Sequence, residues 1–135
     1  MPRFSRKSNL KLQTCHPDLQ RLFREVVRTY DCTVLWGHRN EDQQNEMYLA
    51  IPPVTKVQWP NSKHNSVPSM AVDVAPWIDG KVCFEPRQCY DFAGYVKRVA
   101  EELNIKLRRG ADWDGDGDIN DQTFRDIIHF EIIGG

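Results

Sequence analysis

The sequence lacks any apolar run that approaches the roughly 20 residues a membrane-spanning helix requires. No apolar segment follows its basic start, so we expect no secretory signal. It also contains no internal repeat and no low-complexity linker. Its 135 residues are 40% hydrophobic and 27% charged, which is ordinary for a soluble globular protein. We therefore expect one domain over residues 1–135, without membrane insertion.

The cysteines show no C-x-x-C spacing, which argues against a thiolate zinc site: Cys15, Cys32, Cys83 and Cys89. We interpret them as reduced thiols in a chain made in the cytosol. The net charge is only −1, but the first thirty residues are basic and residues 112–126 are acidic. The basic start could attract an anionic polymer, although a solvated surface is the simpler interpretation. We expect no nucleic-acid partner.

Apolar periodicity and turn residues predict helices alternating with short strands. Helices should begin at Pro17, after the N-cap Asn40, and at Pro86, the last running to about Asn104. Residues 1–15 read as irregular. Strands are expected at 33–36, 69–76, 105–107 and 127–133, with a hairpin turn at Asp79-Gly80. This pattern indicates an α+β fold in which about three helices flank a small antiparallel sheet.

Asp73 lies in the middle of an expected strand, on the same face as Ala71 and Ala75. A carboxylate in that position is costly unless it is paired or bound to a metal, and the small alanines leave room above it. A solvent-facing aspartate on an edge strand is the alternative.

Two histidines complete a candidate metal set with Asp73: His64 in a predicted loop and His129 in the last strand. Two imidazoles and a carboxylate leave a fourth tetrahedral position for water, which is typical of catalytic zinc. Zinc lowers the pKa of such a water to about 7, yet a base must still take its proton. Asp126, in the bend before the last strand, is our candidate. Glu131 shares a face with His129 and would either orient that ligand or form a surface salt bridge.

An acidic segment with aspartates at alternate positions precedes the last strand: Asp112, Asp114, Asp116 and Asp118. With Gly117 as its sixth residue, it matches the start of an EF-hand calcium loop, and Asn120 offers a ninth-position ligand. The twelfth residue is Thr123 rather than glutamate, so Asp118 or Asp121 would have to supply the missing oxygen. The segment therefore predicts a weak or regulatory calcium site, with a solvated acidic loop as the alternative.

Three short motifs carry a resemblance to a known family: Ser62-Lys63-His64, Pro68-Ser69-Met70-Ala71-Val72-Asp73 and Asp126-Ile127-Ile128-His129-Phe130-Glu131. Residues 15–20 and 37–43 extend the likeness over nearly the whole chain. The sequence resembles the zinc peptidoglycan peptidases, which include D-alanyl-D-alanine carboxypeptidases and vancomycin-resistance dipeptidases. Among them it is most similar to the single-domain phage endolysins that act as L-alanyl-D-glutamate endopeptidases.

The resemblance implies roles for the matching residues, beginning with the zinc ligands His64, Asp73 and His129. It implies that Asp126 is the general base, that Arg39 binds the substrate carboxylate or the developing oxyanion, and that Ser62 contacts substrate. The sequence departs from the family pattern in two respects. Many members carry glutamate at the Asp126 position, and the His-to-Asp spacing is two residues longer than in the dipeptidases. The phage endolysins resemble this sequence in both respects.

We therefore expect a zinc-dependent endopeptidase that cuts peptidoglycan stem peptides between L-alanine and D-glutamate and lyses a phage host. As a monomer without a separate wall-binding domain, it would accumulate in the host cytoplasm. It would reach the wall through a membrane-permeabilising partner, and calcium would raise its activity. One alternative is a D-alanyl-D-alanine carboxypeptidase with the same zinc chemistry. The other is a non-enzymatic interaction domain that binds zinc or calcium, against which Arg39 and Asp126 argue.

Overall fold

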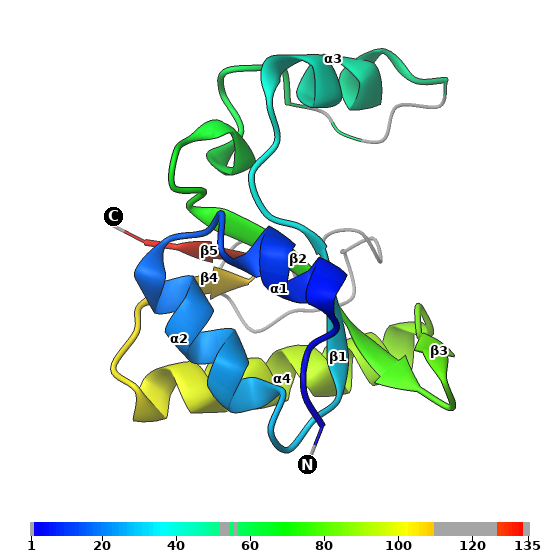
Figure 1. The fold of residues 1–135 in the computed structure, drawn as a ribbon, viewed down its shortest axis with the longest axis vertical. Helices are drawn as coiled ribbons and strands as arrows, with labels where there is room; N and C mark the ends of the chain where they lie inside the picture. Colours follow the sequence, from blue (N-terminus) through cyan, green and yellow to red (C-terminus); the bar gives the residue numbers. More distant parts are fainter. Residues whose placement is uncertain (1, 52–54, 56, 110–126, 134–135) are drawn as a thin grey trace.

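An antiparallel sheet of five strands forms the framework of the chain, and helices pack against it (Figure 1). This computed structural model describes residues 2–51, 55, 57–109 and 127–133. The helices in these ranges are α1 Arg6–Leu12, α2 Pro17–Val26, α3 Glu41–Leu49, the short 3-10 helix η1 Lys63–Asn65, and α4 Pro86–Glu102. The strands are β1 Cys32–Trp36, β2 Ala71–Ile78, β3 Lys81–Val82, β4 Leu107–Arg109 and β5 His129–Ile132. This is the predicted α+β fold.

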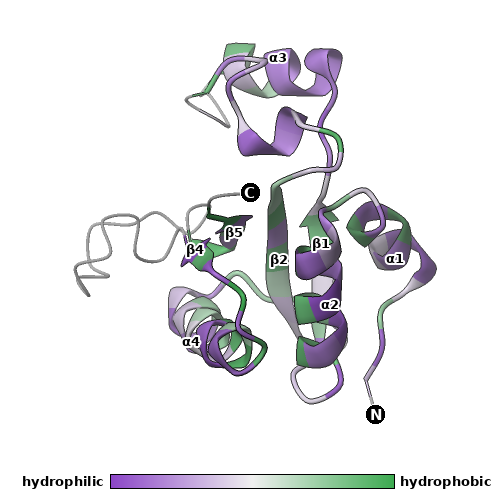
Figure 2. Cartoon of the chain, turned by 90° about the vertical axis from the view of Figure 1, so that its left-hand side faces the viewer, coloured by the Kyte–Doolittle hydropathy of each residue, from purple (hydrophilic) through white to green (hydrophobic). Residues whose placement is uncertain are grey.

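The central strand is β2, in a sheet whose order is β1-β2-β5-β4, with β3 paired to the far end of β2. Antiparallel pairing with β5 sets Val72 opposite Phe130 and Asp73 opposite His129. The first six residues of β2 are all buried, so both of its faces are covered. Helices α2 and α4 pack together and against the sheet, and α1 lies on β1 (Figure 2). Asp73 is therefore not on the solvent-facing edge strand considered as its alternative.

The predicted apolar stripe of α2 forms the centre of the core. Phe23 of α2 meets Phe130 of β5 edge to face with ring centroids 5.3 Å apart, and Phe92 of α4 approaches the same ring at 6.2 Å. Such aromatic pairs add about 0.5–1.5 kcal/mol beyond the area they bury. Because Phe130 directly follows His129, the core fixes the strand that carries a candidate ligand.

The prediction that residues 1–15 are irregular is wrong, because α1 occupies Arg6–Leu12. This helix has too few apolar residues to show a periodic stripe, so long-range contacts stabilise it. Leu12 is fully buried, and the Ser8 hydroxyl accepts a hydrogen bond from the Val34 amide at 3.0 Å. The described chain therefore has four α-helices rather than about three.

The last two strands both begin later than the sequence predicts. β4 begins at Leu107 instead of Ile105, and β5 begins at His129 instead of Ile127. Ile105 and Ile127 are apolar and buried, so hydrophobicity alone extends the strands over them. Both pack into the core from outside the strand ladder, a distinction that an apolar pattern does not contain.

Local turn and cap signals are confirmed. Asp79 and Gly80 have φ values of 55° and 77° between β2 and β3, and a two-residue hairpin turn of this type requires positive φ at both positions. Asn40 caps α3 through a reciprocal pair of hydrogen bonds with Gln43, at 2.8 and 2.9 Å.

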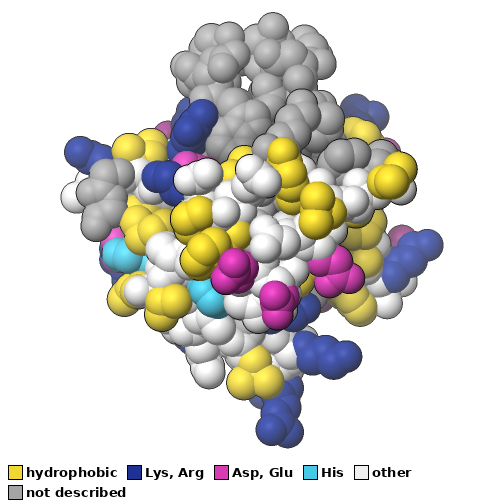
Figure 3. Space-filling model, turned by 90° about the horizontal axis from the view of Figure 1, so that it is seen from above, with side chains coloured by type: hydrophobic (Ala, Val, Ile, Leu, Met, Phe, Trp, Pro, Cys, Tyr) yellow, Lys and Arg dark blue, Asp and Glu magenta, His cyan; other side chains and the backbone are white. Residues whose placement is uncertain are grey.

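The surface seen from above mixes apolar with acidic side chains (Figure 3). Helix α3 stands apart from the sheet (Figure 1). Its one buried residue is Gln44. The Gln44 amide donates to Val57 O at 2.6 Å, and its oxygen accepts from Asn65 Nδ2 at 3.3 Å. A buried amide, rather than an apolar stripe, thus anchors α3. Neither α3 nor any other helix in the described ranges is long and apolar enough to cross a membrane.

Gly37, directly after β1, has no space for a side chain. A Cβ atom there would collide with Lys11 O and Thr14 Oγ1 and would press on Cys15 Sγ. The glycine therefore permits the close approach of the last turn of α1 and the residues after it to the end of β1.

We expect Gly37→Ala to lower the free energy of unfolding by about 1–3 kcal/mol, because the new methyl group meets backbone that cannot easily move. The matched control is Gly94→Ala in α4, where an added Cβ meets nothing within 4 Å. That variant should be more stable by about 0.5–1 kcal/mol, since alanine favours a helix interior. Denaturant unfolding measures both changes, and an unaltered stability of Gly37→Ala would contradict the tight packing described.

Candidate metal centre

Three side chains from distant parts of the chain bring their donor atoms together. His64 Nε2 lies 3.3 Å from His129 Nδ1 and 3.3 Å from Asp73 Oδ1, and the last two atoms are 3.0 Å apart. His64 belongs to η1, Asp73 to the middle of β2 and His129 to the start of β5. The convergence predicted for these three residues is therefore present.

The sheet register places two of the three donors. Asp73 and His129 are directly opposed across the β2–β5 pair, and opposed residues project from the same face. Their positions are 56 residues apart in the chain. The pairing that buries Phe130 against α2 thus also brings the carboxylate and the imidazole together.

The third donor is held by a network around η1. His64 O accepts from the Arg39 amide at 2.8 Å, and Lys63 O accepts from the Met70 amide at 3.0 Å. Ser62 caps η1, because its hydroxyl accepts from the His64 amide at 3.2 Å. Asn65 Oδ1 accepts in return from the Ser62 amide at 3.0 Å. Ser62 therefore positions the His64 backbone, while its predicted contact with substrate stays a prediction.

Each imidazole has an acceptor on the side away from the cluster. His64 Nδ1 donates to Gly37 O at 2.7 Å, which leaves Nε2 as the nitrogen with a lone pair. His129 Nε2 lies 2.9 Å from Glu131 Oε1 and can donate to it, so Nδ1 is the nitrogen that faces the cluster and would bind an ion after losing its proton. Outer acceptors of this kind orient histidines that bind metals. The closely packed Gly37 thus also supplies the carbonyl that orients the His64 ring.

Asp73 is held as a charged carboxylate with its two oxygens turned to different partners. Oδ2 accepts from Arg39 Nη2 at 2.7 Å, and Oδ1 faces the two histidines. Burial alone would raise the pKa of Asp73, but interactions with His64 and His129 hold that pKa well below its usual range. The carboxylate therefore presents one negatively charged oxygen to the cluster at any physiological pH.

The donor set has the dimensions of a small metal site. Ligand atoms arranged tetrahedrally around an ion at 2.0–2.1 Å lie about 3.3 Å from one another. The distances of 3.0–3.3 Å between the three donors agree with that spacing. Two imidazole nitrogens and a carboxylate oxygen suit a transition-metal ion, and His129 is partly exposed at one side of the cluster. The three residues can hold such an ion and leave a coordination position open.

Arg39 is buried beside this cluster. A bulge in β1 between Val34 and Trp36 puts Trp36 opposite Asp73, and the Arg39 guanidinium lies over the Trp36 ring at 5.2 Å. Burial lowers the pKa of Arg39, although Asp73 opposes that shift. Within the described part of the chain, Arg39 Nε is a buried donor without a hydrogen-bond partner. The predicted contact of Arg39 with substrate is not tested by this arrangement.

Several supporting residues are not evident from the sequence. Gly37 and Gln44 act through contacts with residues far along the chain, and no local pattern marks them. Asn65 could have been found, because Ser62 and Asn65 have the three-residue spacing of a capping pair. Glu131 was left between orienting His129 and forming a surface salt bridge, and it is buried with charged partners on both of its oxygens. It contacts His129 and also pairs with Lys63 and Arg108.

The remaining predicted residues lie outside the described ranges: the base candidate Asp126 and the calcium candidates Asp112, Asp114, Asp116, Asp118, Asn120 and Asp121. Their roles stay predictions.

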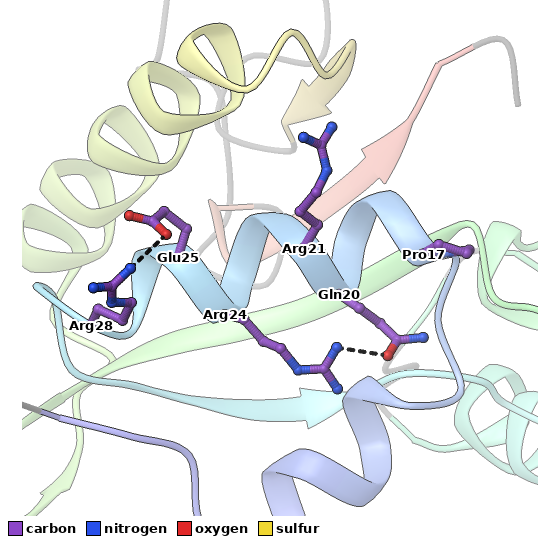
Figure 4. Close-up of a pocket in the computed structure, with 6 residues that line it drawn as sticks. All are labelled: Pro17, Gln20, Arg21, Arg24, Glu25 and Arg28. Atoms are coloured by element: carbon purple, nitrogen blue, oxygen red, sulfur yellow. Dashed lines mark hydrogen bonds and ion pairs between the residues drawn. The ribbon is translucent and has the colours of Figure 1, made fainter.

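A surface depression on α2 has none of the candidate ligands in its lining (Figure 4). It is lined by Pro17, Gln20, Arg21, Arg24, Glu25 and Arg28. Arg28 pairs with Glu25 at 3.2 Å, and Arg24 donates to Gln20 at 3.0 Å. Part of the basic start of the chain is thus a solvated helix face on which Arg28 pairs with an acid and Arg24 bonds to a neutral amide.

Comparisons with known proteins agree with one another. A family model described as phage L-alanyl-D-glutamate peptidase matches residues 1–133. The L-alanyl-D-glutamate peptidase of Escherichia phage T5 is 31% identical over 137 positions, covering 97% of this chain and 98% of that protein. The crystal structure of the Serratia marcescens L-Ala D-Glu endopeptidase ChiX matches with a TM-score of 0.73 and 28% identity, covering 97% of this chain and 90% of that one.

The two histidines give the metal-free protein a defined pH dependence. Burial lowers the pKa of His64, so its charged form opposes folding only at low pH. Burial also disfavours a charged His129, but hydrogen bonds to Asp73 and Glu131 raise its pKa from 6.5 to about 9. A raised folded-state pKa stabilises the fold fully below 6.5, and the stabilisation is lost as the pH rises towards 9.

We therefore expect the free energy of unfolding of the metal-free protein to fall between pH 6.5 and pH 8.5, as measured by denaturant titration with a chelator present. The window ends at about pH 8.5, where ordinary thiols begin to ionise. Above that pH, the raised pKa of the buried Cys15 would add a pH dependence of its own. With metal bound, the ion replaces the proton on His129 and this slope should be absent. A flat profile for the metal-free protein would contradict the raised pKa.

Proposed function

The chain belongs to the phage L-alanyl-D-glutamate peptidase family, and we propose that it is a zinc-dependent endolysin that cleaves peptidoglycan between L-alanine and D-glutamate. The family model and the phage T5 relative both cover nearly the whole chain, which confirms the resemblance predicted from its motifs. The observation that carries the proposal is the convergence of His64, Asp73 and His129. A peptidase with this donor set has the means for metal-assisted hydrolysis.

Zinc is the ion we propose for the site. Its preference for imidazole nitrogen and carboxylate oxygen at 2.0–2.2 Å matches the donors and their spacing. When bound by three protein ligands, zinc supplies Lewis-acid activation of water and of a peptide carbonyl. The outer contacts of the ligands, to Gly37 O, Glu131 and Arg39, would hold them in place for this ion.

The other proposed roles belong to residues beside the donors. Arg39 would bind a substrate carboxylate or the negative charge that develops on the carbonyl oxygen, because its Nε has no hydrogen-bond partner among the described residues. Asp126 would act as the general base, three positions before His129. Ser62 would contact substrate next to His64.

The biological setting is proposed from the family. The substrate is the peptidoglycan of the bacterial host, and the enzyme would act as a monomer. It would be made in the host cytoplasm and would reach the wall once a partner has permeabilised the membrane.

Zinc-loaded protein should digest purified peptidoglycan with loss of the L-alanyl–D-glutamate bond, as read by mass spectrometry of the muropeptides. A chelator should abolish the reaction and zinc should restore it. His64→Ala should lose both bound zinc and activity. Asp126→Ala should keep its zinc but lose roughly 10²–10⁴-fold in rate, because only proton transfer is removed.

Other outcomes of the same digestion separate the alternatives. Release of terminal D-alanine would identify a carboxypeptidase with the same donor set. Wild-type rates for Asp126→Ala would remove that residue from the mechanism. Full activity in a sample free of transition metal would refute the zinc proposal.

We also propose that calcium regulates the enzyme through the aspartate-rich segment. This segment connects β4 to β5 and leads directly to His129. Six aspartates between residues 112 and 126 repel one another unless a cation binds them. A calcium ion would therefore order the segment that leads into Asp126 and His129.

At fixed zinc, calcium should raise the digestion rate of the wild type, and Asp114→Asn with Asp116→Asn should remove that response. The matched control is Asp79→Asn, at the exposed turn between β2 and β3, which should respond as the wild type does. Zinc-loaded enzyme that stays equally active with and without a calcium-selective chelator would rule out this regulation.

A further inference from the structure

Glu131 is a buried carboxylate beside the candidate metal centre, with only 5% of its surface exposed. It lies on β5 two residues after His129, so both side chains project from the same face of the strand. Burying a carboxylate without partners costs folding free energy. The partners of Glu131 are therefore informative about its role.

The two oxygens of Glu131 have separate tasks. Oε1 lies 2.9 Å from His129 Nε2, within hydrogen-bond distance. Oε2 lies 3.6 Å from Lys63 Nζ and 3.9 Å from Arg108 Nη1, which come from η1 and β4. The two half-exposed cations offset the buried charge without occupying the oxygen that faces His129. Glu131 thus connects the segments that carry both histidines.

The two imidazoles turn different nitrogens to the cluster. His64 uses Nε2, and a neutral backbone carbonyl fixes its far side. His129 uses Nδ1, and the far side of its ring meets a charged carboxylate instead. A carboxylate accepts more strongly than a carbonyl, so it fixes the tautomer more firmly and makes the opposite nitrogen a better ligand.

From this geometry we infer that Glu131 is a positioning residue that keeps His129 protonated at Nε2, with Nδ1 turned to the metal. The inference rests on the proposed zinc-dependent function and adds to it a residue outside the donor set. Without Glu131, the ring of His129 could turn or take its other tautomer, and the third donor would be lost for part of the time.

The first test is zinc affinity, measured by competition with a chromophoric chelator. Glu131→Ala should bind zinc about 10–100-fold more weakly than the wild type, the usual cost of losing such an outer partner. Glu131→Gln should lose less, because its amide oxygen still accepts from Nε2. Lys63→Met, which removes an ion pair but keeps the His129 contact, should also lose less than Glu131→Ala. Glu25→Ala removes an exposed glutamate paired with Arg28 and should bind as the wild type does.

The second test reads the tautomer, which a purely structural role would leave unchanged. In the zinc-loaded wild type, nitrogen–proton NMR should show a hydrogen-bonded Nε2 proton on His129. That proton should move upfield in Glu131→Gln, where a neutral acceptor replaces the carboxylate. This variant keeps the volume of the side chain, so it decides the question even if Glu131→Ala fails to fold.

The outcomes separate the two proposals. A wild type that binds no zinc would refute the proposed function and this inference together. A wild type that binds zinc, with unchanged affinity in Glu131→Ala or an unchanged Nε2 proton in Glu131→Gln, would refute the role of Glu131 alone.

Discussion

A buried negative charge at the centre of β2 is the constraint on which the rest of the structure depends. Asp73 lies between two neighbouring strands, where an unpaired carboxylate would destabilise the fold by several kcal/mol. Its partners come from three separate segments: Arg39 after β1, His64 in η1 and His129 in β5. The charge therefore joins three segments that are separate in the sequence.

Much of this arrangement could be predicted because its signals are local. Pro17 and Asn40 mark helix starts through chemistry confined to a few residues, and Asp79-Gly80 marks a turn in the same way. Asp73 could be singled out as a carboxylate that is costly in the middle of a strand, whereas the two histidines gained weight from their order and the family motifs. The distances between the three could not be predicted, because the approach of Asp73 to His129 depends on a pairing across 56 positions.

The parts that could not be predicted depend on long-range contacts. Helix α1 has no periodic stripe, and it is held by contacts with β1 such as that of Ser8 with Val34. Gly37 is required because Lys11 and Thr14 leave no space for a side chain there. Gln44 is buried because Val57 and Asn65 form hydrogen bonds with its amide. A single sequence lists these residues without their neighbours. The outer contacts that aim each ligand belong to this class, which explains why the donors were easier to identify than their supports.

Because Asp73 and His129 face each other across β2 and β5, the three donors can meet only when these two strands pair in the correct register. A slip of one residue would turn His129 to the other side of the sheet, and the pair would be broken. Only the correctly paired sheet would offer all three donors to an ion, so a bound ion would favour it over misassembled forms. In this protein a bound cation would thus stabilise the same strand pairing that forms its own binding site.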